Sequence, residues 1–171
     1  KNNTEEAIKH YENAIKIDNY YNMSRMNLAL LYYQIGKVKE SEALYLKVVE
    51  QEPEFGSAYY MLGLLYNEIG AADKAMEYLE LATKKEPRNS STFYNYALML
   101  QNSGNNNKSL QIINSGLEFF PETERLLYIK LLGELNLKLN TQAKATCLKL
   151  LNIAPTNANY LNILRSLEQG E

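Results

Sequence analysis

Apolar residues recur every three or four positions along most of the chain, which is the spacing of amphipathic helices. In the stretch YYMLGLLYNEIG, residues 59–70, four positions follow the pattern i, i+3, i+4, i+7: Tyr59, Leu62, Gly63 and Tyr66. After Gly70 a second series follows i, i+4, i+7: Ala75, Leu79 and Ala82. The pattern therefore predicts two amphipathic helices that are joined by a tight turn at Gly70.

The same pattern repeats along the chain with a fixed period of 34 residues. All four prolines obey this period: Pro53, Pro87, Pro121 and Pro155. So do the glycines at 36, 70 and 104, whereas Lys138 takes the fourth position. Glycine ends helices in a left-handed conformation, and proline cannot continue a helix. Each unit is therefore predicted to be helix, tight turn, helix and a turn marked by proline.

These columns resemble the tetratricopeptide repeat. The second unit matches that family's pattern almost throughout, with a large aromatic residue, a Leu-Gly pair, small residues and the closing proline: Tyr59, Leu62, Gly63, Tyr66, Ala75, Leu79, Ala82 and Pro87. The resemblance covers nearly the whole chain. It implies an all-α fold, a right-handed superhelical solenoid of antiparallel helix pairs with about ten helices.

The period also sets the expected organisation, which is a single array over residues 1–171. We expect the second helix of a truncated repeat, four complete repeats and a terminal capping helix: residues 1–21, 22–55, 56–89, 90–123, 124–157 and 158–171. The fourth repeat departs most from the pattern, because Leu131 stands at a position that is small elsewhere. We hypothesise that Leu131 fills space vacated by Gly116, one repeat earlier.

A second face of each first helix carries the candidate binding residues. In tetratricopeptide arrays the first helices line a concave groove that holds an extended peptide or a partner helix, and the resemblance transfers this role to eleven positions. They are Met26, Leu30, Tyr33, Tyr60, Leu64, Asn67, Tyr94, Leu98, Gln101, Tyr128 and Leu132. The leucines have an alternative role, which is to pack the floor where adjacent first helices meet. Carboxylate-clamp arrays use Lys, Arg and Asn at set groove positions, and here only Asn95 is of a suitable type and stands in the wrong repeat, so a carboxylate clamp is not expected.

Composition and single residues argue against other classes of function. A net charge of −2 and a pI of about 5.6 disfavour a nucleic-acid surface. No apolar run approaches the roughly 18 residues of a membrane span. His10 is expected on a solvated surface and Cys147 in the core, and no metal, phosphate or nucleophile motif is present. We therefore expect no enzyme activity, no cofactor, no metal site and no membrane insertion.

The sequence thus predicts a scaffold that binds a protein or peptide ligand. Two alternatives remain, an accessory or regulatory segment of a larger multidomain enzyme or cytochrome, and an oligomerisation module. Several stretches resemble bacterial arrays, including those fused to multihaem cytochromes, although no Cys-x-x-Cys-His motif is present. The apolar face of the first helix, around Tyr11 and Ile15, predicts a weak homodimer contact or contact with upstream sequence. No targeting segment is recognisable, so cytoplasm and periplasm are not distinguished.

Overall fold

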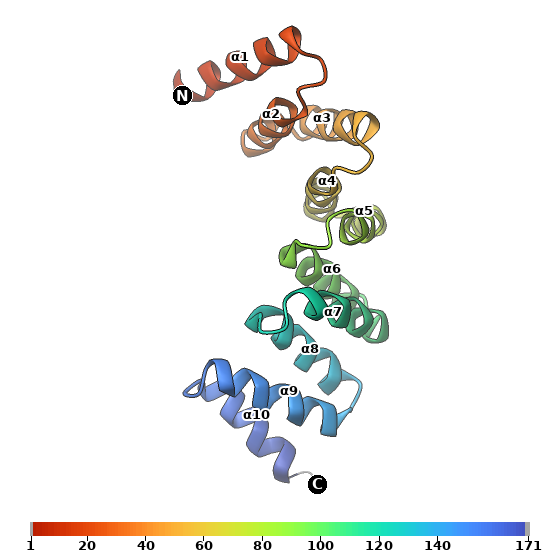
Figure 1. Cartoon of the computed structure of the whole chain (residues 1–171), viewed down its shortest axis with the longest axis vertical. Helices are drawn as coiled ribbons and strands as arrows, with labels where there is room; N and C mark the ends of the chain where they lie inside the picture. Colours follow the sequence, from red (N-terminus) through yellow and green to blue (C-terminus); the bar gives the residue numbers. More distant parts are fainter. Residues whose placement is uncertain (1, 170–171) are drawn as a thin grey trace. The chain divides into compact units, whose positions relative to one another are not determined.

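The chain is all-α. The computed structural model describes residues 2–169, which form ten helices and no strand (Figure 1). The helices are α1 (Asn2–Ile17), α2 (Asn22–Gln34), α3 (Val38–Gln51), α4 (Gly56–Glu68), α5 (Ala72–Lys85), α6 (Ser90–Asn102), α7 (Asn106–Phe119), α8 (Glu124–Asn136), α9 (Asn140–Ile153) and α10 (Ala158–Gln169). The all-α class and the helix number predicted from the repeat pattern are confirmed.

The helices fall into two compact units. Unit 1 spans Lys1–Glu86 and contains α1 to α5, and unit 2 spans Pro87–Glu171 and contains α6 to α10. Within each unit, helices that are consecutive in the chain pack against one another. Such packing is expected for helix pairs that repeat every 34 residues. A single pair cannot bury its own apolar face, so the adjacent helices must cover it.

The tight turns within the repeats have the predicted left-handed backbone. Gly36, Gly70 and Gly104 have φ angles of +80°, +77° and +80°. At Gly70 the amide of Ala71 donates to the carbonyl of Tyr66 and the amide of Gly70 to that of Asn67, the paired bonds of a Schellman turn. The prediction for Gly70 is therefore confirmed.

Lys138 shows that the turn is set by the whole repeat and not by glycine alone. It adopts φ +57°, the only positive φ of a non-glycine residue among the described residues. The same pair of bonds forms around it, from the amide of Leu139 to the carbonyl of Glu134 and from the amide of Lys138 to that of Leu135. A side chain in this conformation costs roughly 1–2 kcal/mol, which the surrounding helix packing offsets.

The size compensation hypothesised between Leu131 and Gly116 stays a prediction. The atoms nearest to a Cβ added at Gly116 all belong to Phe93, the closest at 2.8 Å. Leu131 shares a buried cluster with Cys147 of the same repeat.

The second repeat shows the same pair of positions with the sizes reversed. A Cβ added at Gly63 would lie 2.6 Å from the side chain of Leu79. Gly63 and Leu79 precede Leu131 and Cys147 by two periods of 34 residues. In repeat two the large side chain, Leu79, comes from the second helix. In repeat four it is Leu131, from the first helix. Both pairs occupy the equivalent place where the two helices of a repeat cross.

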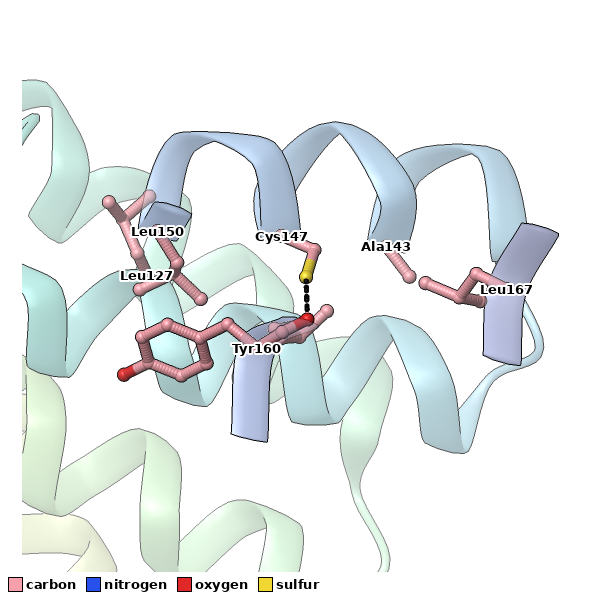
Figure 2. Packing of buried hydrophobic residues seen from close by; sticks show 7 residues of the cluster. Leu127, Ala143, Cys147, Leu150, Tyr160 and Leu167 are labelled. Atoms are coloured by element: carbon pink, nitrogen blue, oxygen red, sulfur yellow. Dashed lines mark hydrogen bonds between the residues drawn. The ribbon is translucent and has the colours of Figure 1, made fainter. Parts of the chain in front are cut away.

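Figure 2 shows the cluster around Cys147 in unit 2, where side chains from α8, α9 and α10 meet. Its buried members are Leu127, Leu131, Ala143, Cys147, Leu150, Tyr160 and Leu167. The Sγ atom of Cys147 donates to the backbone carbonyl of Tyr160 at 3.2 Å. The predicted burial of Cys147 is confirmed.

A buried arginine organises the start of the first repeat. Arg25 is only 2% exposed and stands where later repeats have Tyr59, Phe93 and Leu127. Its Nη1 donates to Asn22 Oδ1 at 2.8 Å and to Gln51 Oε1 at 2.7 Å, and its Nη2 donates to Asn19 Oδ1 at 2.6 Å. A polar network thus joins α2, the end of α3 and the connection from α1, where the other repeats use apolar packing.

Candidate functional site

The candidate residues of unit 1 lie on α2 and α4 at the surface. Met26, Tyr33, Tyr60 and Leu64 are half-buried. Leu30 and Asn67 are exposed, Leu30 at 38%. A row of partly exposed apolar and aromatic side chains on neighbouring helices is the arrangement that a protein-binding surface needs.

Two hollows open along this row. The first has a volume of about 210 Å³ and is lined by residues of α2, α3 and α4 and by the α3–α4 connection: Met23, Met26, Asn27, Leu30, Tyr45, Phe55, Ser57 and Met61. The second has about 220 Å³ and is lined by Tyr33, Tyr45, Met61, Leu64, Leu65, Asn67 and Glu68. Five of the six candidate residues of unit 1 therefore line a hollow, and Tyr60 lines neither.

Tyr45 and Met61 belong to both hollows. Tyr45 comes from α3, behind the surface, and is 1% exposed. Its hydroxyl interacts with the equally buried hydroxyl of Ser41, and neither hydroxyl has a hydrogen bond to any other group. Burial raises the pKa of Tyr45 to about 12, so the hydroxyl keeps its proton. Tyr45 precedes Leu79 by one period of 34 residues, so the repeat pattern predicts a core residue and gives no sign of its place between the hollows.

The candidate residues of unit 2 lie on α6 and α8, and each contacts other residues of the fold. The guanidinium carbon of Arg125 lies 4.1 Å from the centroid of the Tyr94 ring. The Nε2 of Gln101 donates to the backbone carbonyl of Ile129 at 2.8 Å. Leu98 and Leu132 pack against the buried cluster of Phe93, as the floor-packing alternative expects. Tyr128 packs against Tyr160, with ring centroids 6.0 Å apart.

The surroundings of His10 and Cys147, the two titratable residues discussed from the sequence, do not indicate a catalytic role. His10 is exposed, with its Nε2 3.9 Å from Glu6 Oε1. Burial raises the pKa of the Cys147 thiol, which disfavours the reactive thiolate. Among residues 2–169 no group of three or more His, Cys, Asp or Glu side chains could hold a metal ion. None of the helices described is long and apolar enough to cross a bilayer.

Glu134 is a buried acid that the sequence analysis did not single out. It is 1% exposed, and its Oε2 has no hydrogen-bond partner. Burial raises the pKa of this carboxyl, while Thr146 and Lys130 act in the opposite direction. The signal was available in the repeat column, because Tyr32, Tyr66 and Leu100 precede Glu134 at 34-residue intervals.

Paired helices with a 34-residue period and a partly exposed apolar face define a helical repeat protein, a class whose fold suits protein–protein interaction. The chain belongs to the tetratricopeptide repeat family. The sequence profile of that family matches residues 1–54 and 26–91, together more than half of the chain. No curated protein matches the sequence.

Solved structures share the fold over most of the chain. A crystal structure of MamA has a TM-score of 0.74 and 21% identity, covering 90% of this chain and 90% of that one. YrrB, described as a TPR protein with an unusual peptide-binding site, has a TM-score of 0.72 and 20% identity, covering 94% and 83%. A tetratricopeptide repeat protein from Parabacteroides merdae has a TM-score of 0.72 and 15% identity, covering 94% and 64%. At these identities the likeness concerns the fold.

Proposed function

We propose that this chain is a non-enzymatic scaffold that binds a peptide or helix of a partner protein on the surfaces of α2, α4, α6 and α8. The observation that carries the proposal is the pair of hollows in unit 1, since they open beside residues that the repeat pattern selected for binding. Their walls are mostly apolar, with the amides of Asn27 and Asn67 at hand for a partner's backbone. Peptide binding by YrrB, which has a similar fold, agrees with this function.

The eleven candidate residues contribute unequally in this proposal. In unit 1 the side chains of Met26, Leu30 and Leu64 offer apolar surface next to open space. In unit 2 the amide of Gln101 is engaged by α8, and Tyr94 is covered on one side by Arg125. We therefore assign the main apolar contacts with the partner to unit 1, and aromatic and cationic contacts to unit 2.

Changing Tyr60, Leu64 and Tyr94 together to serine is expected to abolish peptide binding while helical content is kept. Interface aromatics often contribute about 2 kcal/mol or more each, so the combined loss exceeds a hundredfold in affinity. The measurement uses peptides selected from a displayed random library on the 171-residue chain, with titration calorimetry for affinity and circular dichroism for helicity.

The matched control for this triple variant removes three exposed apolar side chains outside the proposed surface. They are Tyr20, Tyr21 and Leu148, each changed to serine. The control is expected to bind the selected peptides as the unchanged chain does. Equal affinity of the groove variant and the unchanged chain, or failure of the library to yield any peptide, would argue against the proposed function.

A weak homodimer contact through α1 is a second, smaller part of the proposal. A hollow of about 430 Å³ opens between α1, α2 and α3, with Ile15, Leu28 and Leu44 among its walls. Apolar surface of this kind favours self-association. Light scattering over a concentration series is expected to show a rising mean mass that Ile15→Glu suppresses. A mass that stays monomeric at millimolar concentration would exclude the contact.

A further inference from the structure

The two hollows of unit 1 share two lining residues, which we call the divider. Tyr45 and Met61 are the two residues that line both, so the hollows lie on either side of this pair. Each hollow, at about 210 and 220 Å³, is smaller than the roughly 300–1,000 Å³ of a pocket for a whole small molecule. Their size suits two separate side chains that belong to one partner segment.

The hydroxyl of Tyr45 has no role in the packing that the repeats share. The equivalent positions hold Leu79, Ile113 and Cys147, which are buried in the same way without a hydroxyl. Inside the fold the Tyr45 hydroxyl meets only the hydroxyl of Ser41 and forms no well-aligned hydrogen bond. A buried hydroxyl without a well-formed bond costs roughly 1–3 kcal/mol, and such groups in native proteins generally have a partner. Met61 is the movable part of the divider because its unbranched side chain adopts many rotamers. Because the Tyr45 hydroxyl is buried, a ligand reaches it only if a neighbouring side chain such as Met61 changes rotamer.

Charge separates the two ends of this surface. Among the residues that line the two hollows, Glu68 is the only charged one, and it lies in the second hollow. The opposite end is apolar and rich in methionine, with Met23 53% exposed. A partner segment that matches this surface carries its positive charge at the Glu68 end and apolar side chains beyond it.

We infer that unit 1 binds an extended basic–apolar peptide segment that places two apolar side chains into the hollows on either side of Tyr45. A backbone carbonyl between these side chains accepts a hydrogen bond from the Tyr45 hydroxyl, and a lysine or arginine pairs with Glu68. This inference rests on the proposed function, and it adds the chemistry of the ligand and the residue that reads its backbone.

Peptides selected on the full chain from a displayed random library test the inference. They are expected to share two apolar residues at a fixed spacing and a basic residue on one side of them. Tyr45→Phe removes only the hydroxyl and is expected to weaken binding about five- to tenfold, the worth of one hydrogen bond, without lowering the unfolding temperature. Glu68→Gln is expected to weaken binding of the same peptides. The control Tyr20→Phe, which removes an exposed hydroxyl outside the hollows, is expected to change neither affinity nor stability.

A peptide in which one amide is replaced by an ester provides the decisive comparison, because an ester carbonyl is a weaker acceptor. At the residue that contacts Tyr45, the ester is expected to weaken binding to the unchanged chain but not to Tyr45→Phe. Equal losses in the two proteins at every ester position would overturn the inference. If Tyr45→Phe binds normally while the Tyr60, Leu64 and Tyr94 variant does not, the groove stands and the inference fails. If neither change affects binding, both fail.

Discussion

Replacing Arg25 with alanine is expected to lower the free energy of unfolding of unit 1 by about 2–4 kcal/mol. The guanidinium holds three amide oxygens at once, those of Asn22, Gln51 and Asn19. Asn22 is itself buried and passes the network on by donating to Glu52 Oε1 at 2.6 Å. Without Arg25, a buried acceptor loses its donor and a cavity forms beneath the start of α2.

Native-state hydrogen exchange of the amides in α1, α2 and α3 measures this change locally. Arg25→Lys is expected to lose nearly as much stability as Arg25→Ala, because one ammonium group cannot reproduce the planar fork that reaches three acceptors. Arg88→Ala is the matched control, since Arg88 is exposed and its loss is expected to stay within about 0.5 kcal/mol. Unchanged exchange in Arg25→Ala would show that the network contributes no net stability.

Gly63→Leu alone is expected to cost about 3 kcal/mol or more, and adding Leu79→Cys is expected to recover much of that loss. A leucine at 63 collides with Leu79, whose side chain would lie 2.6 Å from the new Cβ. Leu79→Cys alone leaves a cavity and is expected to cost about 2–4 kcal/mol. The double variant reproduces the Leu131–Cys147 pair that the fourth repeat already contains.

Urea denaturation of the four proteins in this cycle, followed by circular dichroism, yields the coupling free energy. We expect about 2–3 kcal/mol of favourable coupling, in the upper part of the roughly 0.5–3 kcal/mol found for residues in contact. Gly36→Leu combined with Leu79→Cys is a suitable control cycle, because a Cβ at Gly36 has no neighbour within 4 Å. Strictly additive losses for Gly63→Leu and Leu79→Cys would mean that the two positions do not exchange volume.

The fold was predictable from the sequence because the period is carried by residues with strong local effects. Proline and glycine fix where helices end, and the apolar spacing fixes which face is buried. The turn at Gly70 follows directly from these rules. Lys138 could also be anticipated, since the column assigns it the left-handed position that glycine holds in three repeats.

The contacts that single out individual repeats were less predictable. Arg25, Tyr45 and Glu134 each depart from their column, so the sequence marks where the repeats differ. It does not show which side chains meet them, because those come from other helices or from the connections between them. Leu131 illustrates the difficulty: its unusual size is visible in its column, but the column does not show that it joins a buried cluster with Cys147 of its own repeat.

The thiol of Cys147 can report local opening of the helices that bury it. It is the only cysteine of the chain, it is fully buried, and its sulfur is bonded to the carbonyl of Tyr160 (Figure 2). A thiol-specific reagent reacts only after α10 or α9 has moved away and the thiol has lost its proton. The rate of labelling therefore measures how often the packing of α8, α9 and α10 around Cys147 opens in the otherwise native protein, with no engineered probe and no denaturant.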